Sequence, residues 1–344
     1  MKQRYRNIWK WLWTGLAAIL LPACSPEERF DNTPYGNFDA LWSILDQRYC
    51  FFAYKDVAWD EVYTAYRARL SYAMSDKELF GVLAEMLDEL QDGHVNLSSS
   101  FDMARYWAWF EEYPTNFDRE LVMKNYLHQP DYKIAAALYY RILDDCNIGY
   151  IYYENFSSGV GDGNLDQVLL EFAACDGIII DVRNNGGGLL SNVSRIASRF
   201  TAEEFVSGYI QHKTGPGHDD FSEPFAIKQL PAPANRLHFA KPVAILTNRH
   251  CYSATNDFVS VMRNLPQVAV VGDRTGGGSG LPFSSELPNG WVVRFSTSPT
   301  YNAQMEQTEF GIDPTIAVDL APDDAAQGID SIIERAKRWI RTGE

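Results

Sequence analysis

The sequence predicts an α/β protein in which a mainly parallel sheet follows a small helical N-terminal part. Apolar residues recur at helical spacing within the first 90 residues. From residue 148 onward, short apolar runs typical of buried strands alternate with helical patterns. Such alternation requires crossover connections between strands, which produce a parallel sheet. With 344 residues, 46% of them apolar, the chain is long enough to bury a substantial core.

Residues 1–23 are typical of a secretory signal, because four basic residues precede an apolar stretch from Trp11 to Leu21. The stretch is too short for a stable membrane span, and its ending, Leu-Pro-Ala before Cys24, resembles the bacterial lipoprotein signal in which the cysteine is lipidated. We therefore expect a lipid anchor at Cys24 and a location in the cell envelope, facing the periplasm or at the cell surface. An ordinary cleaved signal is the alternative.

A polar tether over residues 24–36 is expected to join this anchor to the fold. Removing residues 1–23 takes away four basic residues and no acidic ones, so the net charge falls from −15 to −19. A strongly acidic surface repels phosphate backbones and anionic membrane surfaces. We therefore expect no nucleic-acid partner and a membrane contact through the lipid only. The oligomeric state stays open.

A helical N-terminal domain is expected over residues 37–92. It contains three predicted helices, and the third begins with a capping box formed by Ser75 and Glu78. Their apolar faces comprise Phe38, Leu41, Trp42 and Leu45 in the first helix, Trp59, Val62, Tyr66 and Leu70 in the second, and Leu79, Val82, Leu83, Met86, Leu87 and Leu90 in the third.

A second domain is expected over residues 93–344. Its predicted strands are 148–153, 177–183, 243–248 and 267–272, and its predicted helices are 165–175, 189–200 and 254–264. Ligands of such sheets bind beyond the carboxyl ends of the strands. Two stretches occupy those ends: Asp181 to Gly188, and Thr247 to Phe258.

Ser253 stands in the second stretch, at a turn where a predicted strand ends and a helix begins. A serine at this corner exposes its hydroxyl, and the free amides at the helix start stabilise negative charge nearby. The glycines of "NNGGG" (184–188) can bring further amides to the same point. A tight turn with an N-capping serine and a phosphate cradle are the alternatives, although neither stretch matches a nucleotide-binding motif.

A serine nucleophile needs a base, and His94 is the candidate. It lies in "LQDGHVNL" directly after the third helix, where Asp92 and Gly93 form a turn that can aim an imidazole into a cleft. An unperturbed imidazole has a pKa near 6.5, which predicts activity that rises through about pH 6 to 7 and is constant by about pH 8. The cysteines other than Cys24 lack metal-ligand spacing, so we expect no metal and no cofactor.

Six stretches occur in the order seen in the C-terminal-processing and tricorn-core serine peptidases: "LDELQDGHVNL", "IGYIYYENF", "GIIIDVRNNGGGLL", "AILTNRHCYSATNDF", "VVGDRTGGGSG" with "LPNGW", and "TEFGIDPTIAV". The resemblance covers roughly residues 80 to 320 and implies a crotonase-like ββα catalytic core after a helical N-terminal part. It also implies that Ser253 is the nucleophile, that His94 is the base of the tricorn-like branch, and that Ala254 with Gly187 or Gly188 supplies the oxyanion amides.

The chain departs from the processing-protease branch in two respects. That branch places a lysine base about 25 residues after the serine, where this chain has Gly278. It also carries a PDZ domain before the strand at 148, but only about 50 residues separate His94 from Ile148. We therefore expect neither a Ser-Lys dyad nor a PDZ domain.

A glutamate before a Gly-x-x-Pro element completes the tetrad of the tricorn-like branch. In "EQTEFGIDPT" the family spacing falls on Thr308, with Glu309 beside it and Glu306 two positions earlier. The resemblance favours Glu309 and leaves Glu306 open.

These features predict an extracytoplasmic, lipid-anchored serine endopeptidase that acts through an acyl-enzyme on unfolded or C-terminal peptide segments. A non-catalytic ligand- or peptide-binding lipoprotein of the same fold is the main alternative. Acyl-CoA hydratase or isomerase chemistry on a crotonase-like fold is a third, although it would not need a serine at a strand-to-helix corner together with a histidine.

Overall fold

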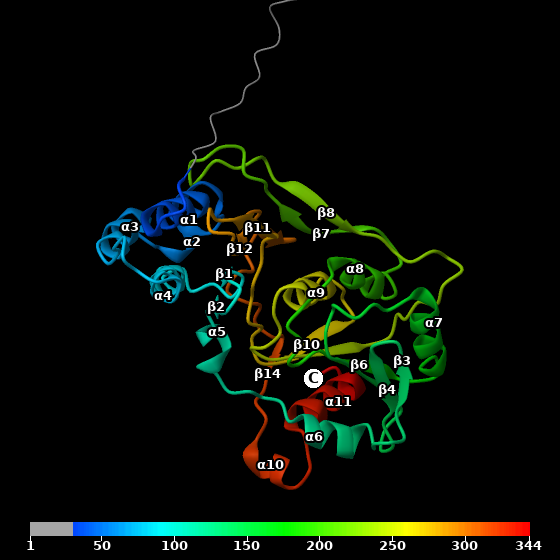
Figure 1. Cartoon of the computed structure of the whole chain (residues 1–344). Helices are drawn as coiled ribbons and strands as arrows, with labels where there is room; N and C mark the ends of the chain where they lie inside the picture. The colour runs from blue at the N-terminus through cyan, green and yellow to red at the C-terminus, as the bar shows by residue number, and fades with distance from the viewer. Residues whose placement is uncertain (1–29) are drawn as a thin grey trace, which may run out of the picture.

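The computed structural model describes residues 30–344 (Figure 1). The expected signal peptide (1–23), the lipidation site Cys24 and the first part of the expected tether lie outside these residues. The first helix begins at Pro34, inside the segment expected to be a tether (24–36). Within residues 30–344, none of the helices has the length and apolar character needed to cross a membrane.

The N-terminal part is built from α1 (Pro34–Arg48), α2 (Phe52–Lys55), α3 (Trp59–Arg67) and α4 (Asp76–Asp88). The three longer helices are those predicted, and Figure 1 shows them gathered on one side of the molecule. The capping box is confirmed: the Ser75 hydroxyl accepts from the Glu78 N–H, and the Glu78 carboxylate accepts from the Ser75 N–H. Their apolar faces enclose a core of their own, which includes Phe38, Leu41, Leu83 and Met86.

An antiparallel sheet closes this core. It has the order β11 (Pro282–Glu286), β12 (Val292–Ser296), β1 (Asn96–Ser98), β2 (Met103–Arg105). Leu97 of β1 pairs with Val293 of β12, and both side chains are buried among the N-terminal helices. The helical core is thus completed by a hairpin from the second half of the chain, while the domain boundary at residue 92 stays a prediction.

The central sheet has seven strands in the order β14-β10-β9-β6-β5-β4-β3. The first five run parallel, and β4 and β3 are antiparallel. The strands are β3 (Lys133–Ala135), β4 (Leu138–Ile142), β5 (Ile148–Tyr153), β6 (Gly177–Asp181), β9 (Val243–Thr247), β10 (Val268–Gly272) and β14 (Ile316–Ala317).

Helices cover both faces of this sheet. One face packs on α7 (Asp162–Glu171), α8 (Leu190–Ala197) and α9 (Ala254–Met262), and the other on α11 (Ser331–Thr342) and the π-helix η1 (Val122–Tyr126). Ile178 and Ile180 of β6 point into the first layer and Ile179 into the second, which explains why "GIIID" is continuously apolar. The predicted α/β class with a helical N-terminal part is confirmed.

The remaining elements lie around this body. A three-stranded sheet has the order β13 (Thr300–Asn302), β7 (Phe205–Ile210), β8 (Phe225–Gln229), and three short helices are α5 (Ala108–Glu111), α6 (Arg119–Leu121) and α10 (Pro322–Ala326). Because β6 and β9 are parallel neighbours, the loops that follow them leave the sheet at the same edge.

Candidate active site

The two loops expected to meet do so at the ends of β6 and β9. The backbone N–H of Tyr252 donates to the carbonyl of Asn185 at 3.2 Å. The backbone N–H of Asn184 donates to the side-chain oxygen of Asn248 at 3.0 Å. These bonds hold the glycine loop against the turn that carries Ser253.

Ser253 has a strained backbone, with φ 57° and ψ −122°, at the turn before α9. Bonds on both sides hold it there: its N–H donates to the Gly277 carbonyl at 2.9 Å, and its carbonyl accepts the N–H of Asp257 at 3.0 Å. Its side chain does not cap α9, so the N-cap alternative does not describe the hydroxyl. In α/β hydrolases, the nucleophilic serine lies on a strained strand-to-helix turn that exposes its hydroxyl.

His94 faces this hydroxyl, with its Nε2 atom 3.0 Å from Ser253 Oγ. The turn after α4 aims the ring, because Asp92 Oδ1 accepts the backbone N–H of His94 at 2.7 Å. Asp92 is itself held by the hydroxyl of Tyr49, which donates to Oδ2 at 2.7 Å. The structure thus brings together two predicted residues that lie 159 positions apart in the chain.

The ring of His94 is buried, with 3% exposure. Burial lowers the pKa of His94 to about 4, and the negative charge of Asp92 opposes this shift only in part. The ring is therefore neutral at pH 7, which is the form that accepts a proton. This pKa lies below the range of about pH 6 to 7 over which the sequence predicts activity to rise, because the sequence does not reveal how deeply the ring is buried.

The other ring nitrogen, Nδ1, faces two groups of the opposite wall. The backbone carbonyl of Ser279 accepts a hydrogen bond from the ring, and Ser296 Oγ lies 3.4 Å from Nδ1. A proton held on Nδ1 leaves the lone pair of Nε2 free to face Ser253. This is the tautomer that a general base for the serine requires.

Glu309 lies in the network behind His94 without touching the ring. It is buried, its Oε2 atom accepts the N–H of Ser279 at 2.9 Å, and its Oε1 atom lies 3.0 Å from Lys55 Nζ. Glu306 is exposed and accepts from the side-chain amide of Asn302 instead. Of the two glutamates left open, Glu309 is therefore the one that the fold connects to the histidine.

The amides of Gly187 and Gly188 in the glycine loop differ in their hydrogen bonding. The N–H of Gly187 already donates to Asn185 Oδ1 at 3.0 Å. Within the part of the chain that the structure describes, the N–H groups of Gly188 and Ala254 have no acceptor. Gly187 still has a packing role, because a Cβ there would lie 2.6 Å from the Tyr252 carbonyl. Of the amides predicted for the oxyanion, those of Gly188 and Ala254 are thus the two without an acceptor among the described residues.

Gly278 cannot be replaced by the lysine of the processing-protease branch in this fold. Its φ is 75°, and a Cβ at this position would lie 2.3 Å from the ring of Tyr252.

Cys251 is no second nucleophile, since burial raises its pKa to about 12 and its thiol donates to the Val182 carbonyl. Across residues 30–344, no group of three or more His, Cys, Asp or Glu side chains is placed to hold a metal.

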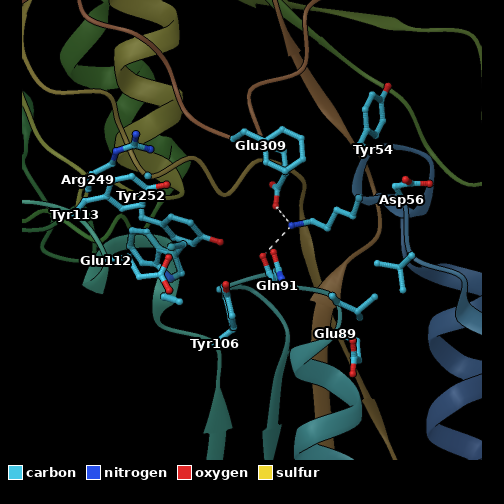
Figure 2. Close-up of a pocket in the computed structure, with 18 of the residues that line it drawn as sticks. Tyr54, Asp56, Glu89, Gln91, Tyr106, Glu112, Tyr113, Arg249, Tyr252 and Glu309 are labelled. Atoms are coloured by element: carbon cyan, nitrogen blue, oxygen red, sulfur yellow. Dashed lines mark hydrogen bonds and ion pairs between the residues drawn. The ribbon is translucent and has the colours of Figure 1, made fainter. Parts of the chain in front are cut away.

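A cleft of about 730 Å³ lies between the N-terminal helices, the segment that carries α5, and the loop before Ser253 (Figure 2). Its lining includes the chain neighbours of His94 and Ser253 but neither of these two residues. Gly93, Tyr252 and Glu309 line its inner wall. Lys55, the last residue of α2, also lines the cleft. The sequence analysis did not single it out, because the residues next to it in the chain give no sign of its distant partners.

Comparisons with known proteins agree with this geometry. The model of peptidase family S41 matches residues 147–318, half of the chain, and that of the tricorn protease C1 domain matches residues 30–88. The tricorn protease of Thermoplasma acidophilum is 27% identical over 206 residues, which cover 56% of this chain and 17% of that protein. The carboxy-terminal processing protease CtpA of Bacillus subtilis is 24% identical over 192 residues, which cover 55% of this chain and 39% of that protein.

The chain therefore spans well under half the length of these two curated relatives. A solved structure of a candidate peptidase from Parabacteroides merdae is similar over nearly its whole length: it is 55% identical with a TM-score of 0.86, and the alignment covers 90% of this chain and 97% of that one. The matched family model and this shared fold agree with the order of motifs in the sequence. The chain belongs to peptidase family S41, a family of serine peptidases.

Proposed function

We propose that this protein is an extracytoplasmic serine endopeptidase that hydrolyses peptide bonds through an acyl-enzyme on Ser253. Ser253 Oγ attacks the carbonyl carbon of the scissile bond while Nε2 of His94 takes the hydroxyl proton. The N–H groups of Gly188 and Ala254 stabilise the negative oxygen that forms. His94 then gives its proton to the leaving amine, and a water molecule that His94 deprotonates releases the acyl group.

One observation carries this proposal: Nε2 of a neutral, buried histidine lies 3.0 Å from the hydroxyl of a strained serine. A serine and a histidine in hydrogen-bond contact, with free amides beside them, are the arrangement that acyl transfer requires. A binding protein of the same fold has no need for the strain at Ser253.

We further propose that the substrate is an extended polypeptide, such as an unfolded region or a C-terminal segment. The cleft of about 730 Å³, which is lined by Gly93 and Tyr252 next to His94 and Ser253 in the chain, has room for several side chains of such a segment. One matched relative is named a carboxy-terminal processing protease, which supports the same substrate class.

The proposed location is the cell envelope, through a lipid on Cys24. Its support is the basic and apolar leader that ends in Leu-Pro-Ala-Cys, which lies outside the described residues.

Labelling by a serine-directed fluorophosphonate tests the proposed activity. The native protein should be labelled, Ser253→Ala should not, and Ser71→Ala, which removes an exposed serine, should be labelled like the native protein. Cleavage of an unfolded protein such as reduced casein should be lost in the same variant. A folded native protein that neither reacts nor cleaves would favour the binding lipoprotein instead.

A further inference from the structure

Lys55, the last residue of α2, has its ammonium buried in the wall between the cleft and the catalytic dyad. Its side chain is 6% exposed, and Nζ lies 3.0 Å from Glu309 Oε1 and donates to the Gln91 carbonyl at 3.1 Å. Figure 2 labels both partners, Glu309 and Gln91, on the wall of the cleft and marks the two interactions with dashed lines. A buried lysine is costly unless it is paired, so this position has a reason beyond packing.

The surroundings of Lys55 contain two buried carboxylates, Asp92 and Glu309. Burial alone would lower the pKa of Lys55, but the charges of Asp92 and Glu309 raise it above its ordinary value. Burial and the charge of Asp92 raise the pKa of Glu309, and Lys55 opposes that rise. Lys55 is thus the cation that favours the ionised form of Glu309.

Glu309 transmits this interaction to the histidine through a single residue. Its Oε2 atom accepts the N–H of Ser279 at 2.9 Å, and the carbonyl of Ser279 accepts the hydrogen bond from the ring of His94. A carboxylate accepts such a bond more strongly than a protonated carboxyl does. The state of Glu309 therefore affects how firmly Ser279 is held, and with it the acceptor that keeps the proton on Nδ1.

We propose that Lys55 is a positioning residue of this active site: its ammonium holds the Glu309 carboxylate against the Ser279 amide, and thereby holds the ring of His94 in the orientation and tautomer that face Ser253. The inference rests on the proposed function. It means that the N-terminal helices supply part of the catalytic network and do more than cover the sheet.

Other charged and titratable groups also face His94, and Lys55 acts among them. Asp92 lies on the same turn, Tyr252 precedes α9 and Arg294 comes from β12. Removing Lys55 leaves these groups in place. Its specific effect is on Glu309, whose pKa rises further once its partner is gone, so that the carboxyl keeps its proton to higher pH.

Steady-state kinetics of Lys55→Ala test the proposal. We expect kcat at pH 7 to fall by about 10- to 100-fold with KM unchanged, because the substrate still binds while the base is misplaced. The loss should shrink as the pH rises, because a larger share of Glu309 then ionises without the ammonium. Lys77→Ala, which removes an exposed lysine of α4, should keep native kinetics. A native kcat in folded Lys55→Ala would overturn the proposal.

Chemical rescue separates positioning from a general loss of stability. Lys55→Ala lacks three methylene groups and the ammonium, which n-propylammonium supplies, and the cleft gives it a route to the site. We expect propylammonium to restore kcat severalfold and n-propanol to restore none. Equal rescue by both compounds, or by neither in a folded variant, would contradict the role of the charge.

A double variant shows whether Lys55 acts through Glu309. In the Glu309→Gln background the carboxylate is already absent, so adding Lys55→Ala should cost less than about twofold in kcat. If the two substitutions lower kcat independently, so that their effects multiply, Lys55 does not act through Glu309. Lys55→Ala alone leaves the Glu309 carboxylate buried without its partner and could fail to fold for that reason. The double variant has no carboxylate at 309, so its kcat can still be compared with that of Glu309→Gln.

Ring ¹⁵N shifts of His94 provide a test that needs no turnover. In the Ser253→Ala background, with His94→Gln used for assignment, we expect a proton on Nδ1 alone. Adding Lys55→Ala should give a mixture of both tautomers. An unchanged tautomer would refute the positioning role of Lys55 even if the protein is an active peptidase. Absence of fluorophosphonate labelling in the native protein would instead refute the proposed function, and the tautomer measurement would remain valid.

Discussion

Tyr252 shows how one side chain can exclude a lysine from this site. Its ring packs 4.9 Å from the ring of His94 and stacks 4.1 Å from that of Trp109, centroid to centroid. It also occupies the space that a Cβ at Gly278 would need. A lysine at 278 is therefore excluded by volume and by backbone conformation, which supports the proposal that His94 is the base.

The pKa of His94 can be measured by NMR titration in the Ser253→Ala variant, which keeps the ring but prevents turnover. Because burial disfavours the charged imidazolium, we expect a value near 4, well below that of an exposed histidine. Above pH 6 the ring then stays neutral, so any loss of activity between pH 8 and 6 has another origin. A titration midpoint of 6.5 or higher would contradict the buried environment.

Kinetic coupling between Ser253 and His94 gives a second prediction at this scale. Ser253→Ala and His94→Ala should each lower kcat by about 1,000-fold or more, and the double variant should be hardly slower than either, since the two groups act as a unit. Circular dichroism should confirm that all three remain folded. Near-native turnover of folded His94→Ala would remove the histidine from the mechanism.

At the scale of elements, a buried ion network joins the end of β6 to the start of α11. Arg183 is fully buried, with Nη2 2.6 Å from Asp181 Oδ2 and Nη1 2.9 Å from Asp330 Oδ2. Asp330 also caps α11, since it accepts the N–H groups of Ile332 and Ile333. The network braces the backbone directly before the glycine loop.

Replacing Arg183 by methionine should therefore destabilise the protein strongly. Two buried carboxylates would lose their shared partner, which costs about 3 to 5 kcal/mol in the free energy of unfolding. Urea denaturation followed by fluorescence measures this loss. Arg338→Met, on the exposed side of α11, is the matched control and should change stability by less than about 0.5 kcal/mol. Equal stability of the two variants would show that the network contributes little.

Considered as a whole, the molecule assembles its site from both of its parts. Lys55 and His94 come from the N-terminal helices and the turn that follows them, whereas Ser253 and Glu309 come from loops of the later α/β part. The cleft lies between these parts. A relative movement of the two would therefore change the distance between base and nucleophile, so the packing of β1 on β12 also serves the chemistry.

The proposed anchor gives a prediction for the whole protein in the cell. If Cys24 carries the lipid, Cys24→Ser should move the protein from the detergent phase to the aqueous phase after Triton X-114 partitioning, because the soluble part has an acidic surface with little affinity for anionic membranes. Cys146→Ser, at a partly buried cysteine of the folded part, should partition like the native protein. Unchanged partitioning of Cys24→Ser would rule out lipidation at this residue.

The sequence alone determined the class of the fold and the position of the dyad in the chain. Strand and helix periodicity is local, so the central strands, the helices between them and the three long N-terminal helices were predictable within a few residues. Turn chemistry is local too, and it marked Ser253 at a strand-to-helix corner and His94 after a helix. The order of the motifs then indicated the family.

Only the tertiary structure decided how these residues work. Burial and distances between segments far apart in the chain lower the pKa of His94, leave the amide of Gly188 free while that of Gly187 is bonded, and connect Glu309 rather than Glu306 to the histidine. Lys55 is the clearest case, since its proposed role depends on a partner 254 residues away in the chain. Electrostatic energy depends on separation in space and on exclusion of water, and neither quantity is written in the local pattern of a sequence.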